Sequence, residues 1–378
     1  MKFSDVVGHD DLKKRLITNT IQGRISHTQM FLGADGSGAL PLALAFARFL
    51  QCRKKGADDA CGTCPSCLKF NKLEHPDLHF FFPTASNQEH KKDVSSKLFL
   101  KHWRELLLQQ PYFSYLDWLV KMNIENKQAI INAEDCSDII RILGLKSYES
   151  PFKVIIIYMV EKFYHAAAPR LLKVLEEPPD KTLFLLVAEN KDLILNTILS
   201  RAQILKIPLP GEETVRETLV TKHGLDPKKT GTIAFLSEGN MNEALRLLHQ
   251  NEGDMADFHS FREWMRSCFK NEVAKILKWV EQTSRAGRER QKSFLQYGLK
   301  IFRLCLLHNY QAGELIRLEG EEAQFVKNFA PYINHLNAID MVDAFHVAIG
   351  HLERNANPKI LFTDLSFQLV SLMKVRIR

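Results

Sequence analysis

Four short apolar runs, separated by helical patterns, constrain most strongly what this chain can fold into. The central run, Lys153–Val160, is rich in β-branched residues, as expected of a strand that is covered on both faces. Similar runs occupy Gln29–Leu32, Thr182–Val187 and Ala202–Ile207. Strands that alternate with helices favour a parallel sheet, so we predict an α/β fold for this part of the chain.

The pattern changes after Pro208–Gly211, where prolines and a glycine end the strand-containing part. Beyond it, residues 211–252 form a short helical stretch, and residues 253–378 carry long amphipathic helices that can bury their apolar faces only against one another. A chain of 378 residues is long enough for two or three domains of about 150 residues each. We predict an α/β domain over 1–210, a small helical lid over 211–252 and an all-α domain over 253–378.

The composition excludes several classes of protein. A hydrophobic fraction of 45% with 25% charged residues is typical of a globular chain and not of a disordered, collagenous or coiled-coil one. The net charge of +7 is too dilute to indicate nucleic-acid binding by itself. No apolar stretch approaches the ~20 residues of a membrane span, and the first residues have no signal-peptide core. We therefore expect a cytoplasmic protein without membrane contact.

A glycine-rich loop joins the first predicted strand to the next helix, which is the context of a P-loop-type phosphate site. A working loop reads G-x-x-x-x-G-K-[ST], in which the lysine neutralises phosphates and the hydroxyl binds magnesium. Here an alanine and a leucine replace those two residues, and Asp35 adds a negative charge to the loop. The degenerate loop contains Gly33, Gly36, Gly38, Ala39 and Leu40.

A second part of an ATPase site is missing as well. The central strand of a phosphate-loop ATPase ends in an acidic pair that positions magnesium and the attacking water, whereas this strand ends in Tyr158-Met159. Because the loop residues and the acidic pair are lost together, we interpret the ATP site as inactive. We therefore expect neither ATP hydrolysis nor an ATP cofactor. Binding of a nucleotide or another anion without hydrolysis stays open, because a helix N-terminus still attracts anions.

Four of the seven cysteines lie within sixteen residues, in the pattern C-x8-C-x2-C-x2-C. A reducing cytosol disfavours disulfides, and four thiolates at this spacing can surround one zinc ion tetrahedrally, with no position left for water. We predict a structural zinc site in a module at about 52–78; an iron–sulfur cluster and a redox pair are the alternatives. The predicted ligands are Cys52, Cys61, Cys64 and Cys67.

A polar and aromatic stretch at about 82–134 carries no motif and has the character of an insertion. Its aromatics, among them Trp103 and Trp118, alternate with lysines and could stack on bases. We favour a small helical pack of their own as the simpler interpretation.

At this point several segments resemble the clamp-loader branch of the AAA+ ATPases, and within it the bacterial delta-prime subunits of DNA polymerase III. The most specific is Leu171–Pro179, which reads Leu-Leu-Lys-Val-Leu-Glu-Glu-Pro-Pro. The resemblance covers residues 1 to about 250, and the rest agrees with the family only in being helical. The other segments that carry it are Phe3–His9, Phe31–Gly33, the cysteine cluster and Ile198–Ala202.

The resemblance implies an AAA+ domain with an inserted zinc module, a lid and a helical collar used for oligomerisation. Catalytic members of the branch have an intact loop and acidic pair, whereas delta-prime subunits have lost them, as this chain has. Ser200-Arg201-Ala202 stands where the family has Ser-Arg-Cys, and Arg201 is by resemblance an arginine finger for the ATP site of a neighbouring subunit. The family's two sensor positions have also lost their typical residues: Ala188-Glu189 stands at one and Asn242 at the other.

The resemblance therefore implies a non-hydrolysing member of a heteropentameric clamp loader in DNA replication. Its partners would be the gamma/tau and delta subunits, with the sliding clamp and primer–template DNA reached through the complex. The chain would not be an enzyme by itself, but part of a holoenzyme that acts as a DNA-directed DNA polymerase. The alternatives are an active gamma/tau-type ATPase and a free-standing zinc-dependent DNA-binding module.

Overall fold

The computed structural model describes residues 1–124, 127–164, 168–249, 252–310 and 320–374. Parts of the predicted insertion, lid and all-α domain, namely 125–126, 250–251, 311–319 and 375–378, lie outside the described residues. The chain divides into two compact units: Met1–Ile124 with Gln128–Leu247 forms one, and Leu248–Arg378 makes up nearly all of the other. The helices predicted as a lid therefore group with the α/β part.

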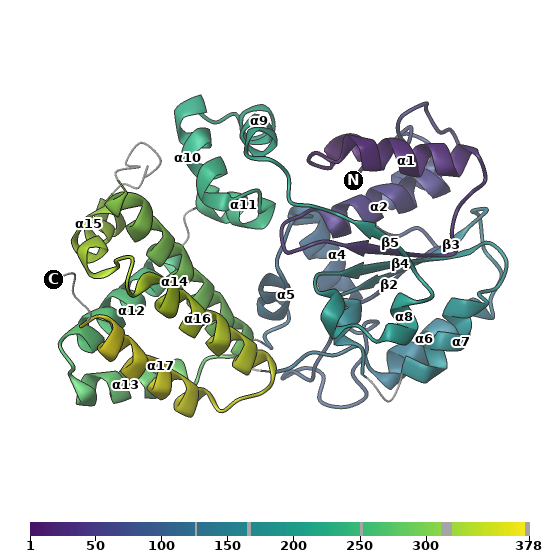
Figure 1. Cartoon of the computed structure of the whole chain (residues 1–378). Helices are drawn as coiled ribbons and strands as arrows, with labels where there is room; N and C mark the ends of the chain where they lie inside the picture. The colour runs from purple at the N-terminus through teal and green to yellow at the C-terminus, as the bar shows by residue number, and fades with distance from the viewer. Residues whose placement is uncertain (125–126, 165–167, 250–251, 311–319, 375–378) are drawn as a thin grey trace. The chain divides into compact units, whose positions relative to one another are not determined.

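A five-stranded parallel sheet forms the centre of the first unit, in the order β2-β3-β4-β1-β5 (Figure 1). This arrangement confirms the α/β prediction, and four of the strands fall on the four predicted runs. The fifth, β2, was not predicted; it is a four-residue edge strand that pairs only with β3. The strands are β1 (Thr28–Leu32), β2 (Leu78–Phe81), β3 (Lys153–Tyr158), β4 (Thr182–Ala188) and β5 (Gln203–Lys206).

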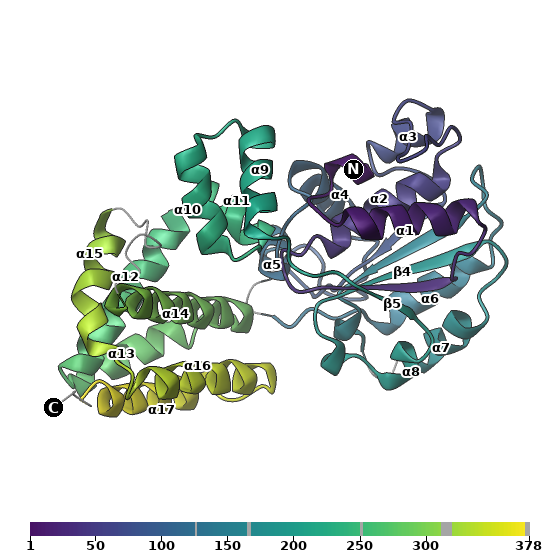
Figure 2. The same ribbon diagram turned by 45° about the horizontal axis from the view of Figure 1, so that its top comes forward.

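Helices cover both faces of the sheet, which explains the continuous apolar runs. Along β3, Val154 and Ile156 pack into the core on one face, while Ile155 and Ile157 pack on the other. Helix α2 is buried along its whole length on the first face, and Figures 1 and 2 show α6, α7 and α8 on the opposite face. The helices of this layer structure are α1 (Asp10–Ile21), α2 (Ala39–Gln51), α3 (Pro65–Phe70), α4 (Leu100–Gln109), α5 (Tyr115–Lys121), α6 (Ala133–Leu143), α7 (Ala168–Glu176) and α8 (Asn196–Leu199).

The aromatic residues of the insertion are buried, as the simpler interpretation predicted. Trp103 stacks on Phe82 with ring centroids 4.3 Å apart, and Trp118 meets both rings edge-on. The cluster is not separate, however, because the Trp103 ring also lies 5.2 Å from that of Tyr158 on β3. The insertion is therefore part of the core that covers the first face of the sheet.

Three further helices, which we call the lid helices, complete the first unit: α9 (Glu212–His223), α10 (Pro227–Ser237) and α11 (Met241–His249). The second unit is all-helical over its described residues, as predicted. Its core is centred on Trp264, which stacks on Trp279 at 4.3 Å and donates a hydrogen bond to Ser366 Oγ at 2.9 Å. Its helices are α12 (Glu252–Phe269), α13 (Val273–Thr283), α14 (Arg288–Asn309), α15 (Gly320–Phe329), α16 (Ala338–Glu353) and α17 (Pro358–Leu372).

Among the described residues, none of the helices combines the length and apolar character that crossing a membrane requires.

The half-buried His79 on β2 makes the stability of the sheet depend on pH. Burial and the nearby positive charge of Lys153 lower the pKa of His79 to about 4, whereas an unfolded histidine titrates near 6.5. Between these values the unfolded state binds the extra proton, so its population grows as the pH falls. The stabilising contribution is complete above pH ~6.5 and is lost as the pH falls towards ~4.

We predict that His79→Gln reduces the loss of unfolding free energy between pH 6.5 and pH 4. Urea unfolding at a series of pH values, followed by circular dichroism, measures this loss. His27→Gln, the same substitution at an exposed histidine, provides the control. Equal profiles for the wild type and the His79 variant would show that this histidine does not set the acid sensitivity.

Candidate functional site: an occupied phosphate-type loop, an exposed arginine and a four-cysteine cluster

The glycine-rich loop lies between the end of β1 and the start of α2. Gly36 and Gly38 have φ values of +73° and +88°, which favour glycine, and Gly38 is the N-cap of α2. A side chain at Gly33 would meet the backbone oxygen of Ile207 at 2.5 Å, so the close approach of the residue after β5 also requires glycine there. The loop thus requires glycine at three positions for its backbone conformation and packing.

The residues that replace the phosphate-binding side chains belong to the core. Ala39 and Leu40 are buried in the first turn of α2. At the end of β3, Tyr158 and Met159 are also buried, and burial raises the pKa of Tyr158 well above its usual range. These side chains supply no positive charge to a phosphate and no carboxylate to a metal ion.

The insertion places Tyr112 against the loop. The Tyr112 hydroxyl accepts a hydrogen bond from the backbone N–H of Val7 at 2.8 Å, and a Cβ added at Gly38 would lie 3.2 Å from that oxygen. Tyr112, its neighbours Pro111 and Phe113, and the loop line a half-open pocket with only about 30 Å³ of space for water. That volume holds two or three water molecules, since a water needs roughly 10–15 Å³ of such space. The sequence alone did not indicate this role of the insertion.

The lid helices contact the same loop. The Asp35 carboxylate accepts hydrogen bonds from Asn240 Nδ2 at 3.2 Å and Asn242 Nδ2 at 2.6 Å, and the backbone N–H of Met241 donates to Gly36 O at 3.1 Å. Burial raises the pKa of Asp35, and the two amide donors oppose that rise. Asp35, which the sequence suggested would repel phosphate, thus also holds the start of α11 on the loop.

Arg201 lies just after α8, outside the set of residues that line the loop cavity. Its Nε donates to Glu176 Oε1 at 2.5 Å, its Nη2 contacts the same oxygen, and its Nη1 donates to the backbone oxygen of Thr197 at 2.7 Å. Ser200 is the C-cap of α8, and its hydroxyl lies 3.5 Å from Arg201 Nη1. The Arg201 side chain is 28% exposed, so the guanidinium reaches the surface.

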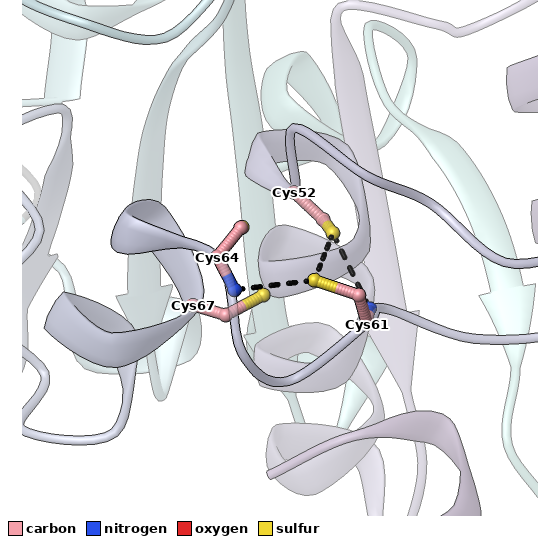
Figure 3. Close-up of side chains that lie close together, drawn as sticks. All are labelled: Cys52, Cys61, Cys64 and Cys67. Atoms are coloured by element: carbon pink, nitrogen blue, oxygen red, sulfur yellow. Dashed lines mark hydrogen bonds between the residues drawn. The ribbon is translucent and has the colours of Figure 1, made fainter.

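The four predicted cysteines meet beside the end of α2 (Figure 3). Cys52 is the C-cap of α2, Cys64 is the N-cap of α3, and Cys67 lies in the first turn of α3. Between Cys61 and Cys64, Gly62 adopts a φ of +79°, which allows the tight turn. The four sulfur atoms lie within 4.8 Å of one another, so they can surround a single metal ion.

The surroundings of the cluster shift the pKa values of its thiols in opposite directions. Backbone N–H groups of Thr63 and Cys64 lower the pKa of Cys61 to about 6, whereas burial raises that of Cys67 to about 12. The side chain of Arg48, a residue only 4% exposed, bonds to Cys67 and opposes that rise. Four thiolates around a divalent cation leave two net negative charges, and a buried guanidinium complements them.

The other three cysteines, Cys136, Cys268 and Cys305, are buried in their helices and lie outside the cluster. Their burial makes them core thiols.

We predict that Asp35→Ala loosens the contact between the lid helices and the loop. The variant removes both side-chain acceptors, and hydrogen bonds to a carboxylate contribute about 1.5–3 kcal/mol each. Amide hydrogen exchange at Met241, whose N–H donates to Gly36 O, should therefore accelerate at least about tenfold. Asp192→Ala, at an exposed position outside this contact, is the control; equal exchange in both variants would contradict the prediction.

The sequence of this chain matches a known protein family. The family model described as DNA polymerase III, delta subunit, matches residues 8–210. The chain is 27% identical over 235 residues to the DNA polymerase III subunit delta' of Haemophilus influenzae, covering 62% of this chain and 59% of that protein. It is 26% identical over 239 residues to subunit delta' of Bacillus subtilis, again covering 59% of the relative. The match thus spans about three fifths of the length of these relatives.

Likeness extends to other subunits of the same polymerase. The DNA polymerase III subunit tau of Bacillus subtilis is 23% identical over 386 aligned positions, covering 96% of this chain and 60% of that protein. Among solved structures, a DNA polymerase III gamma subunit-related protein from Thermotoga maritima has 15% identity and a TM-score of 0.38, covering 97% of this chain and 100% of that one. The family model matches more than half of the chain, and the two delta' proteins are among its most similar relatives, so the chain belongs to the DNA polymerase III delta' subunit family.

Proposed function

We propose that this chain works in the cytoplasm as the delta' subunit of a DNA polymerase III clamp loader and hydrolyses no ATP itself. The observation that carries this proposal is the filled loop, in which Tyr112 and the lid leave a cavity of about 30 Å³ where an ATPase would hold triphosphate. Membership of the delta' family supports the assignment. The loader would be a heteropentamer with gamma/tau and delta subunits, and it would reach the sliding clamp and primer–template DNA as a complex.

In this proposal Arg201, assisted by Ser200, completes the ATP site of a neighbouring gamma/tau subunit. During hydrolysis water attacks the γ-phosphorus while the bond to ADP breaks, and negative charge grows on the phosphoryl oxygens. A guanidinium held against those oxygens stabilises that charge. The surface position of Arg201, away from the loop of its own chain, suits action on another subunit.

The alternative is an active gamma/tau-type ATPase, which the likeness to subunit tau brings into consideration. Such an enzyme needs a positive side chain at the start of α2 and acidic groups after β3. Ala39, Leu40 and Tyr158 fill these places with buried side chains that can do neither.

We predict that Arg201→Ala lowers the DNA-dependent ATPase activity of the reconstituted loader by an order of magnitude or more at the neighbouring site, as loss of an arginine finger does elsewhere. Steady-state phosphate release measures the activity. The purified chain alone should release no phosphate above background. Turnover by the chain alone, or an unchanged rate in the Arg201 variant, would contradict the proposed function.

We further propose that the four-cysteine cluster holds one structural zinc ion. Cys52, Cys61, Cys64 and Cys67 supply four sulfur ligands, the number that a closed tetrahedral site requires, and three of the four are buried. The ion would fasten the loop after α2 to the start of α3. No open position would remain for a reacting water, so the role would be structural.

We predict one zinc ion per chain in protein purified without chelator, measured by inductively coupled plasma mass spectrometry. Cys64→Ser should abolish zinc binding and lower the unfolding temperature, because binding energy at a structural site contributes to folding. Cys305→Ala, which alters a buried thiol outside the cluster, should retain the metal. Iron instead of zinc would favour the iron–sulfur alternative, and absence of any metal would exclude both.

A further inference from the structure

We propose that Glu176 is a positioning residue for Arg201: it orients the guanidinium so that one edge is free to meet the phosphoryl group in the neighbouring subunit. This inference rests on the proposed function. Glu176 is the last residue of α7 and belongs to the segment Leu171–Pro179, whereas Arg201 follows α8. The two residues come from separate segments and meet through their side chains.

The contacts of the guanidinium define its orientation. Arg201 Nε, at 2.5 Å, and Nη2 both donate to Oε1 of Glu176, so the carboxylate occupies the edge formed by these two nitrogens. On another side, Nη1 donates to the backbone oxygen of Thr197 at 2.7 Å. Acceptors from two helices therefore fix both the plane of the guanidinium and its rotation within that plane.

This arrangement leaves one edge available. A guanidinium carries five N–H donors, and the contacts with Glu176 and Thr197 use one on each of its three nitrogens. One hydrogen on Nη1 and one on Nη2 therefore remain, and among the described residues the one further contact of these nitrogens is that of Nη1 with Ser200 Oγ at 3.5 Å. The Nη1–Nη2 edge has the fork geometry that binds two phosphoryl oxygens. The carboxylate then lies on a different edge from the phosphate, where the repulsion between them is smaller.

The exposure of the pair indicates that it serves orientation more than stability. The side chains of Arg201 and Glu176 are 28% and 46% exposed, and ion pairs at such exposure add little to folding stability. A free arginine side chain, by contrast, samples many rotamers, and fixing it on arrival of the phosphate costs entropy. An arginine that Glu176 already holds has lost its rotamer freedom before the phosphate arrives. The entropy cost of fixing the side chain therefore does not add to the barrier of the chemical step.

The next residue supplies a matched control. Glu177 is also exposed and also follows the body of α7, but it is not among the residues that contact the Arg201 guanidinium. Substitutions at Glu177 change the local charge as much as those at Glu176 do. They leave the contacts of Arg201 intact.

The test uses the whole loader, reconstituted with the sliding clamp and primer–template DNA, and measures ATPase rate against ATP concentration. We expect Glu176→Ala to lower kcat about tenfold, since misplacing a catalytic group by about 1 Å can cost up to a hundredfold. KM should stay nearly unchanged. Glu176→Gln, which retains one acceptor oxygen, should fall between Glu176→Ala and the wild type. Glu177→Ala and Glu177→Gln should match the wild type, and all variants should assemble into the loader to the same extent.

A double-variant comparison separates positioning from a general structural effect. In an Arg201→Ala background, Glu176→Ala should cause no further loss, because no guanidinium remains to be oriented. The inference is overturned if Glu176→Ala behaves like Glu177→Ala, if it raises kcat, or if its effect persists without Arg201. If Arg201→Ala itself leaves the ATPase unchanged, the proposed function fails and the inference fails with it; a loss with Arg201→Ala but not with Glu176→Ala overturns the inference alone.

Discussion

The parallel pairing of β1 between β4 and β5 is the constraint on which the rest of the α/β unit depends. Parallel strands place their carboxyl ends at one edge of the sheet, so the loop after β1, Tyr158 at the end of β3 and Glu189 after β4 converge there. Both faces must be covered, which the apolar helix α2 does on one side and α6 and α7 do on the other. The parallel sheet thus determines at which edge these residues come together.

At that edge, hydrogen bonds within the chain lie where a nucleotide-binding site would contact its ligand. A nucleotide site would hold a phosphate with cationic side chains, whereas here the buried Asp35 carboxylate is held by the amides of Asn240 and Asn242. The volume next to Gly38 is filled by Tyr112, whose hydroxyl is itself satisfied by the N–H of Val7. The buried Asp35 carboxylate and the Tyr112 hydroxyl therefore have their partners within the chain.

Much of this could be predicted from local pattern. The runs that became β1, β3, β4 and β5 were recognisable because buried strands are apolar throughout, and the cysteine cluster because its members lie close in sequence. Strand β2 was missed, since Leu78–Phe81 is short and lies at the edge of the sheet. The aromatic insertion was correctly expected to pack, but not to pack on Tyr158.

The sequence by itself determined the order of the helices and strands apart from β2, the loss of the phosphate-binding lysine and hydroxyl, and the four sulfur ligands, because each depends on residue type or on short spacing. Only the tertiary structure decided that Tyr112 fills the loop, that Asn242 bonds to Asp35, and that Glu176 holds Arg201. These contacts join residues far apart in the chain. Which residues become partners depends on how the sheet and its helices pack, and a local sequence pattern does not predict this packing.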